Sequence, residues 1–390
     1  MTIKRLVGEA FLSAADFIEG KISAEKIRIG VTVLGSEHGV ENVLAGAKLA
    51  EKLPGIELVL IGPKNDTGFE THEVETEADA HKKMEELLDN KSISACVTMH
   101  YNFPIGVSTV GRVISPAMGK EIFIATTTGT SATDKVEAMI KNSIYGNIVA
   151  KSCGVKNPKI GILNIDGAKA VERELKNLIK NGYDIELATS QRADGGSFMR
   201  GNDLLTGSAD VMVCDSLTGN ILMKLFSSYS TGGSYEATGY GYGPGIGFDY
   251  NRSIFIISRA SGAAVIKGAI EYAYEVARGD IFKVIEQENK KLKAAKFNDV
   301  LATLKTCKLP GAGASATVKS DKPLPAKEVV TADISGLDVM DLDEAVSLLM
   351  NEGIYAESGM GCTGPIILVN PVNEKRTVEL LIKNKFISEK

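Results

Sequence analysis

Tryptophan is absent from this chain of 390 residues, and cysteine and histidine are scarce, with five and four residues. The cysteines stand at positions 96, 153, 214, 307 and 362, without a C-x-x-C pair. An odd number of widely spaced cysteines excludes a disulfide framework and favours a reducing compartment. No set of cysteines and histidines has the spacing of a four-ligand zinc site, so we predict no metal centre.

Long hydrophobic runs are also missing. No stretch approaches the ~20 apolar residues that a membrane-spanning helix needs. Charged residues interrupt positions 1–20, which indicates an amphipathic helix and no secretory signal. The formal net charge is −5, which argues against nucleic acid as the main ligand. We therefore predict a cytoplasmic protein without nucleic-acid or membrane partners.

The common nucleotide-binding motifs are absent as well. The chain has no Walker sequence, and no G-x-G-x-x-G follows its first predicted strand. We therefore predict no bound cofactor.

Short apolar runs alternate with amphipathic stretches along the chain. Such strands alternating with helices form a largely parallel sheet covered on both faces, so the predicted fold class is α/β, in three αβα layers. The runs predict strands at residues 27–34, 56–61, 93–99, 122–125, 159–164, 184–187, 209–214, 253–257 and 366–369. The amphipathic stretches predict helices at 38–52, 78–88, 131–150, 168–180, 217–226, from after 257 to 277, 280–305, 342–350 and 373–383.

The composition changes toward the C-terminus. Residues 309–327 are rich in proline, glycine and alanine, which is typical of a linker. We predict an α/β core with an N-terminal helix over residues 1–295. Residues 296–390 are predicted to form a small α/β extension, which carries a glycine-rich loop at 358–365.

A hydroxyl-rich loop at 126–134 follows one predicted strand and precedes a helix. Hydroxyls and free helix N–H groups at the carboxyl end of a strand suit a phosphate or a carboxylate, which makes Thr128, Gly129 and Thr130 candidate ligands. The alternative is an ordinary Ser/Thr-capped helix start.

A second candidate loop begins at Asp215, directly after the strand that Cys214 ends. The position of Asp215 at a strand end has two interpretations. It is a candidate catalytic or substrate-positioning residue, and the alternative is a helix N-cap. Ser216 and Asn220 follow as candidate ligands, and Lys224 would face the same crevice from one to two turns into the helix. A further glycine-rich loop at 227–248 is long enough to be functional or mobile.

Cys362 differs from the other cysteines because Gly361 and Gly364 flank it. Backbone N–H groups in such a loop lower the pKa of a thiol and can hold the oxyanion of a tetrahedral intermediate. Cys362 is therefore a candidate nucleophile for acyl chemistry, and the alternative is a small residue in a tight turn.

The other thiols and the histidines carry weaker signals. Cys214 closes a buried strand, which favours core packing. Cys96 lies in an apolar strand, with His100 nearby. We keep Cys96, His38 and His100 as secondary candidates, and no general base is identifiable.

Three segments of the chain resemble the acyl-carrier-protein:phosphate acyltransferases of bacterial phospholipid synthesis. The similar stretches are ADVMVCDSLTGNILMK at 209–224, IGILN at 160–164 and residues 242–270. Thr32 and Glu37 stand where that family has two aspartates, and residues 258–261 replace its histidine. The resemblance covers residues 25–280 and implies an isocitrate/isopropylmalate dehydrogenase-like fold.

The chain, including its C-terminal part, is also similar to another family, the alpha subunits of protein C of glycine/sarcosine/betaine reductase. LGSEHGVENVLAGA at 34–47 and GCTGP at 361–365 carry this resemblance. It implies that Cys362 holds an acetyl group as a thioester and releases it to inorganic phosphate as acetyl phosphate. It also implies a beta subunit of protein C, a carboxymethylated selenoprotein as acyl donor, and an oligomeric assembly.

Two alternatives stay open. The first is an acyl-carrier-protein:phosphate acyltransferase without a covalent intermediate, which would not need Cys362. The second is a non-catalytic scaffold subunit of an acyl-transfer complex, because function depends on site geometry that a sequence does not supply.

Overall fold

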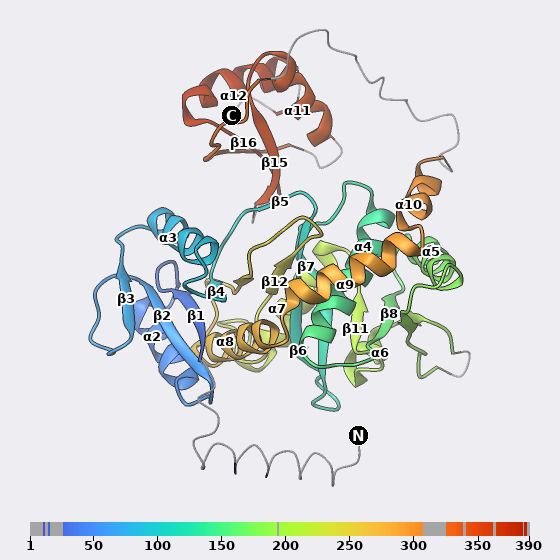
Figure 1. Ribbon diagram of the computed structural model, residues 1–390, viewed down its shortest axis with the longest axis horizontal. Coiled ribbons are helices and arrows are strands. Elements are labelled where there is room, and N and C mark those ends of the chain that lie inside the picture. The colour runs from blue at the N-terminus through green and yellow to red at the C-terminus, as the bar shows by residue number, and fades with distance from the viewer. Residues whose placement is uncertain are drawn as a thin grey trace.

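A large mixed sheet with helices on both faces forms the body of the protein, and a smaller α/β unit stands at one edge of it (Figure 1). The computed structural model describes residues 26–192, 195–306, 325–337, 341–361, 364–384 and 386–387, together with positions 11 and 15. The predicted helix at 1–20 and most of the predicted linker lie outside these residues.

The strands of the large sheet are β1 (Ile27–Thr32), β2 (Ile56–Gly62), β3 (Glu70–Glu73), β4 (Ala95–Thr98), β6 (Val107–Ile114), β7 (Glu121–Thr130), β8 (Lys159–Leu163), β9 (Glu186–Leu187), β10 (Phe198–Met199), β11 (Val211–Val213), β12 (Gly243–Ile246) and β13 (Ile254–Ile256). The helices of this part are α2 (Gly39–Ala50), α3 (Glu77–Asp89), α4 (Lys135–Ser152), α5 (Ala168–Lys180), α6 (Gly201–Thr206), α7 (Ser216–Ser228), η1 (Tyr229–Thr231), α8 (Ala263–Arg278), α9 (Ile281–Ala294) and α10 (Phe297–Thr306).

The strand order is β10-β8-β11-β7-β6-β12-β13-β4-β1-β2-β3, and β9 also pairs with β8. Neighbours in each half of the sheet are parallel, for example β1 with β2 and β11 with β7. The central strands β6 and β12 are antiparallel to their neighbours and join the two halves. The predicted α/β class with a mostly parallel sheet is confirmed.

Two hydrophobic clusters fill the space on either side of the large sheet. One contains buried side chains of α2, α4, α5 and α8, and the other those of α3 and α6. α4 is buried on nearly all sides, which explains why its sequence shows no single apolar stripe. Every helix in the described part of the chain is too short or too polar to span a bilayer.

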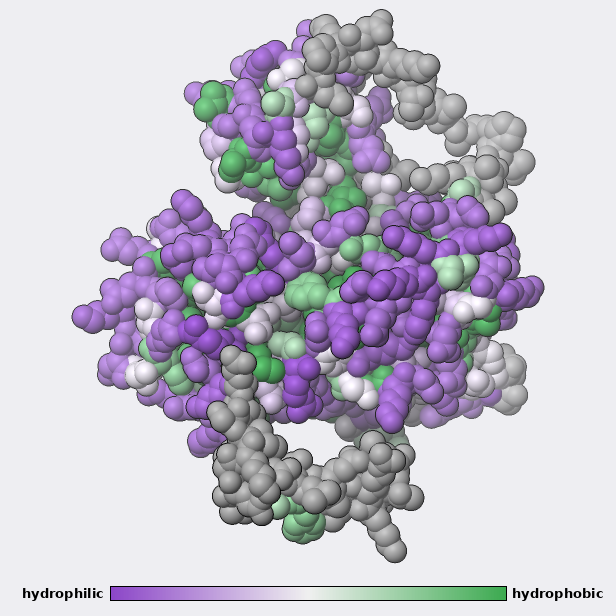
Figure 2. Space-filling view, in the orientation of Figure 1, coloured by the Kyte–Doolittle hydropathy of each residue, from purple (hydrophilic) through white to green (hydrophobic). Residues whose placement is uncertain are grey.

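The C-terminal unit has its own sheet, ordered β14-β16-β15-β5, and its own hydrophobic cluster. Its elements are β14 (Ala332–Ser335), α11 (Leu342–Asn351), β15 (Ala356–Gly361), β16 (Gly364–Val369), η3 (Pro371–Asn373) and α12 (Glu374–Lys383). The body supplies β5 (Phe103–Pro104), which pairs with β15 through only two residue pairs. In space-filling view, this unit joins a largely hydrophilic body through a narrow neck (Figure 2). The predicted boundary at 295/296 stays a prediction.

Three predicted loops prove to contain strands. Residues 126–130 continue β7, and Gly129 and Thr130 pair with β6 beyond a break in the register. Residues 243–246 of the predicted loop at 227–248 form the buried strand β12. Most of the predicted loop at 358–365 belongs to the paired strands β15 and β16. The prediction was wrong at these places because glycine and hydroxyl residues were taken as loop residues, although threonine is β-branched and favours strands, and strand pairing can include glycine.

Candidate functional site

A small cavity of about 310 Å³ lies where β7 ends and where α4 and α7 begin. Both helices point their N-termini toward it, so the positive ends of two helix dipoles meet at one place. The cavity gathers residues from two stretches of the body, 126–142 and 215–216, and one residue from the C-terminal unit. Its lining includes Gly129, Thr130, Ser131, Lys135, Asn142, Asp215, Ser216 and Pro365.

The end of β7 forms one wall of the cavity. Gly129 has a φ of +78°, and a Cβ there would lie 2.6 Å from the carbonyl oxygen of Val107. Only glycine fits this backbone without strain, which explains the glycine inside the threonine-rich segment. The predicted candidates Gly129 and Thr130 therefore do line a cavity, although they lie in a strand and not in an open loop.

The first turn of α7 forms the facing wall. Asp215 is the N-cap of this helix, because its carboxylate accepts hydrogen bonds from the Thr218 N–H at 2.9 Å and from the Thr218 hydroxyl at 3.1 Å. Asp215 and Ser216 also line the cavity. The two interpretations left open for Asp215 are thus compatible, since its capping role holds it at the cavity wall.

Lys135 is a cavity residue that the sequence reasoning missed. Its ammonium lies 3.6 Å from the Asp215 carboxylate, and its side chain is 45% exposed. Lys135 is the first residue of α4, and the N-cap Asp134 holds that helix start by accepting from the Glu137 N–H. A lysine directly after the hydroxyl-rich segment is the signal that could have identified it.

Asn142 is the second residue that was missed. It is buried, and its side-chain oxygen accepts from the hydroxyls of Ser131 at 2.7 Å and Ser108 at 3.0 Å. Its amide group lies 3.4 Å from the carbonyl oxygen of Cys214. The side chain thereby connects α4 to three strand ends, and a polar residue inside an apolar helix was the available signal.

The C-terminal unit reaches the cavity through Pro365. Cys362 lies outside the described residues. Gly361 and Gly364, on either side of residues 362 and 363, pair with one another as β15 and β16. Cys362 therefore precedes β16 by two residues in the sequence, and Pro365, the second residue of β16, lines the cavity.

Thr128 and Asn220 do not line this cavity. The Thr128 N–H donates to the Thr109 hydroxyl at 3.0 Å, and its carbonyl oxygen accepts from Thr126 at 3.0 Å. The Asn220 amide donates to the carbonyl oxygen of Thr127 at 3.4 Å. Both residues support the wall by connecting β6, β7 and α7.

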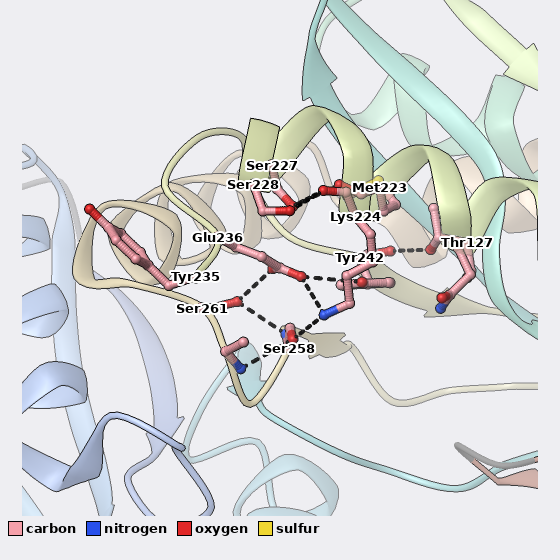
Figure 3. A network of polar contacts seen from close by, with 12 residues as sticks. Thr127, Met223, Lys224, Ser227, Ser228, Tyr235, Glu236, Tyr242, Ser258 and Ser261 are labelled. Atoms are coloured by element: carbon pink, nitrogen blue, oxygen red, sulfur yellow. Dashed lines mark hydrogen bonds and ion pairs between the residues drawn. The ribbon is translucent and has the colours of Figure 1, made fainter. Parts of the chain in front are cut away.

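Lys224 belongs to a different polar network, which Figure 3 shows. Its ammonium donates to the Glu236 carboxylate at 2.8 Å and to the Ser258 hydroxyl at 2.7 Å. Glu236 is 1% exposed and also accepts from the hydroxyls of Ser261 at 2.9 Å and Tyr242 at 3.3 Å. The structure therefore does not bring Lys224 to the cavity that holds Asp215.

We expect Lys224→Met to destabilise the protein by about 2 kcal/mol, because it leaves the buried Glu236 carboxylate without its cation. The double variant Lys224→Met/Glu236→Gln should recover most of that stability, as measured by urea denaturation. If the enzymatic activity that the sequence predicts returns together with stability, the role of Lys224 is structural. If only stability returns, Lys224 contributes to the reaction itself.

The described cysteines are not suited to nucleophilic attack. Cys96 and Cys214 are fully buried, and burial raises the pKa of each thiol far above its usual value. Burial also raises the pKa of Cys153, to about 12. Thiols of this kind remain protonated at neutral pH. Cys96 packs beside Gly30 in β1 and lies away from the cavity, so its position does not favour the secondary role considered for it.

The two candidate histidines also lie away from the cavity lining. His38 is exposed at the start of α2, and its ring contacts Tyr235 edge-to-face at 5.9 Å. His100 is half-buried, and burial together with the charge of Arg259 lowers its pKa. Among the described residues, no three His, Cys, Asp or Glu side chains gather as a metal-binding group.

Comparisons with known proteins identify the family of this chain. The family described as "Fatty acid synthesis protein" matches residues 27–368. The "Glycine/sarcosine/betaine reductase complex component C subunit alpha" of Peptoclostridium acidaminophilum is 58% identical over 97% of both chains. A "Phosphate acyltransferase" of Campylobacter concisus is 27% identical over 67% of this chain and 98% of its own length.

Among solved structures, 4-hydroxythreonine-4-phosphate dehydrogenase from Klebsiella pneumoniae aligns with a TM-score of 0.41 at 12% identity, over 65% of this chain and all of that one. The family match spans both the large sheet and most of the C-terminal sheet. The chain therefore belongs to the fatty acid synthesis protein family, together with the component C alpha subunits of glycine/sarcosine/betaine reductase.

Proposed function

We propose that this protein is an acyltransferase with phosphate as acceptor. It would form acetyl phosphate from an acetyl thioester on Cys362 as part of an amino-acid reductase complex. The observation that carries this proposal is the position of Pro365, three residues after Cys362, in the cavity between the starts of α4 and α7. The names of the similar proteins, a reductase component C and phosphate acyltransferases, support the same class of reaction.

Some of the residues that line the cavity are of the kinds that bind inorganic phosphate in proteins. Thr130, Ser216 and Lys135 are among its lining residues, and the helices α4 and α7 begin at it. Helix N-termini and lysine are common partners of phosphate oxygens. Asp215 would then hold Lys135 in place by the ion pair that already joins them.

The reaction follows from such an arrangement. An oxygen of the bound phosphate attacks the carbonyl carbon of the thioester, and the carbon–sulfur bond breaks as the acyl phosphate forms. The thiolate of Cys362 leaves and takes up the proton that the phosphate gives up. Phosphate already carries a nucleophilic oxygen, so its positioning contributes more to the rate than its deprotonation does.

The name of one relative suggests one of the two proposed partners. That relative is called a component C subunit alpha, so we propose that this chain assembles with a beta subunit of the same component. A carboxymethylated selenoprotein is the proposed source of the acetyl group. Its Se–CH2 bond would be cleaved reductively, with oxidation of the selenium and a thiol of the same selenoprotein to an Se–S bond, and the carboxyl group would form the thioester with Cys362 and release water. Both partners would have to reach the segment at residues 361–365.

Incubation with acetyl phosphate followed by peptide mass spectrometry tests the proposal, because the last step is reversible. We expect an acetyl group on the peptide that contains Cys362, and loss of that group when inorganic phosphate is added. Acetyl phosphate turnover without any adduct would instead support direct phosphate acyl transfer. Absence of both turnover and adduct, alone and with the partner subunit, would support the scaffold alternative.

Lys135→Met should raise the KM for inorganic phosphate by roughly 10- to 100-fold, since one charge-assisted contact to an anion contributes ~1.5–3 kcal/mol. Its exposed position predicts an unchanged melting temperature. Lys159→Met is a matched control, because Lys159 is also an exposed lysine with an ion pair at 3.6 Å, but it lies at the start of β8. An equal effect of both substitutions on the KM would contradict the proposed site.

A further inference from the structure

The C-terminal unit, whose described residues begin at Pro325, has a hydrophobic core of its own. Ten buried apolar side chains form this core, and all of them belong to the unit. From the described part of the body, one hydrophobic side chain packs against this core, the partly buried Ile105. The ion pair between Lys327 and Glu357 also joins two residues of the unit. A unit with its own core keeps its fold when its contacts with the rest of the chain break.

A short strand pairing connects this unit to the body. β15 pairs with β16 through six residue pairs, but it pairs with β5 through two. In one of these two pairs Pro104 lies opposite Gly359, and proline has no N–H group to donate to the sheet. Glycine adds no side chain that could pack across the strands. Because cross-strand pairs stabilise a sheet, we expect this shortest pairing of the four-stranded sheet to open first.

The body holds β5 firmly. Phe103 is 2% exposed, and its ring contacts the rings of Tyr101 and Tyr250 edge-to-face, at centroid distances of 5.2 Å and 5.7 Å. Such aromatic contacts add to the stabilisation that burial of the ring provides. The weak point therefore lies between β5 and β15, where the unit meets the body (Figure 1).

The covalent connection leaves room for the unit to separate from the body. α10 ends at Thr306, and the described residues of the unit begin at Pro325. The 18 residues between them span up to about 60 Å when fully extended. The length of the chain therefore does not keep the unit on the body.

The position of the unit in this structure suits one of the two transfer steps that the proposed function requires. Pro365 lines a cavity of about 310 Å³, which places the unit for release of the acyl group to phosphate. A cavity of this size admits a small molecule and not a donor protein. Transfer of the acyl group from a protein donor to Cys362 would therefore take place with the unit away from the cavity.

We infer that the C-terminal unit is a carrier of the acyl group, which leaves the body by breaking the β5–β15 pairing, is loaded by the donor, and returns to the cavity. The identity of the cargo rests on the proposed function, whereas the separation rests on the strand pairing and the separate core. The unit would move as a whole, because the pairings of β16 with β14 and β15 lie within it.

A disulfide between β5 and β15 tests the inference. Directly opposite residues of antiparallel strands have the Cα separation that a disulfide requires, so Pro104→Cys/Gly359→Cys should lock the unit on the body. A Cβ at residue 359 would lie 3.4 Å from its nearest neighbours, so there is space for a side chain. Asp333→Cys/Leu368→Cys is the matched control, since it joins opposite residues of β14 and β16 within the unit. Peptide mass spectrometry identifies the two cysteines of each bond.

Hydrogen exchange measures the separation without any reaction. In the Pro104→Cys/Gly359→Cys variant, we expect reduction of the disulfide to accelerate exchange of the backbone amides of residues 101–106 by at least ~10-fold, because these amides exchange when the unit leaves. Reduction of the control disulfide should leave their exchange unchanged. Equal exchange in the oxidised and reduced forms of the first variant would overturn the inference, whether or not the chain transfers acyl groups.

The activity of the locked chain tests the carrier role. Oxidised Pro104→Cys/Gly359→Cys should still acquire an acetyl group on Cys362 from acetyl phosphate, but transfer from the protein donor should fall at least ~10-fold and recover on reduction. A locked chain that accepts the acyl group from the donor at the wild-type rate would overturn the inference and leave the proposed function intact. If the wild type acquires no acetyl group, the proposed function and the carrier role both fail, while hydrogen exchange still decides whether the unit separates.

Discussion

Replacing Cys362 by alanine is expected to reduce phosphorolysis of an acyl donor by roughly 10³-fold or more, because no thioester can form without the sulfur. The melting temperature should stay unchanged, since the substitution removes a single atom. An assay of acetyl phosphate formation in the presence of donor and partner subunit measures the effect. A variant with wild-type activity would refute the assignment of Cys362 as the nucleophile.

Cys214→Ala is the control for this experiment. The Cys214 thiol is buried against the carbonyl oxygen of Thr126 at 3.6 Å, and burial raises its pKa. We expect this substitution to cost about 1 kcal/mol of unfolding free energy, through a small cavity, and to leave the rate of acyl transfer nearly unchanged. A large loss of activity at an unchanged melting temperature would mean that Cys214 takes part in the chemistry.

Gly219→Ala should have the largest effect on stability among the substitutions considered. A Cβ at this position would overlap the carbonyl oxygen of Thr126, so α7 would have to move away from β7. We expect a loss of about 3 kcal/mol, measured by urea denaturation. Activity should fall as well, because the displaced helix carries Asp215 and Ser216 away from the cavity.

Gly201→Ala provides the comparison, because Gly201 is also helical and has open space around its Cα. Alanine there should be neutral or slightly stabilising, in line with its higher helix propensity. If both substitutions have the same effect, the tight contact between α7 and β7 is not what requires glycine at 219.

The alternation of strands and helices was predictable from the sequence, since period and length identify each element. α5 was predicted with its observed bounds, and α2, α8 and α11 within a few residues. The antiparallel strands β6 and β12 were not predicted. β6 is rich in β-branched residues and could have been identified, whereas the glycines and proline of β12 do not favour a strand locally, and its pairing depends on segments that are distant in the sequence.

The sequence predicted which types of residue form the candidate site, but it did not predict all of the residues that line the cavity. Asp215, Ser216, Gly129 and Thr130 do meet at one cavity, because adjacent parallel strands end at the same edge. Lys224 does not join them, since its position on α7 turns it toward Glu236. The sequence does not determine which neighbour each face of a helix contacts, because this depends on tertiary packing.

By itself, the sequence determined the α/β class, the absence of long apolar runs, and one cysteine among glycines that matches a particular subunit family. Only the tertiary structure decided that Pro365 meets the starts of α4 and α7, and that α7 leaves Leu217, Ile221 and Leu225 exposed. The physical reason is that periodicity and composition are local properties of the chain. A cavity or an uncovered face arises from contacts between segments that are far apart in sequence.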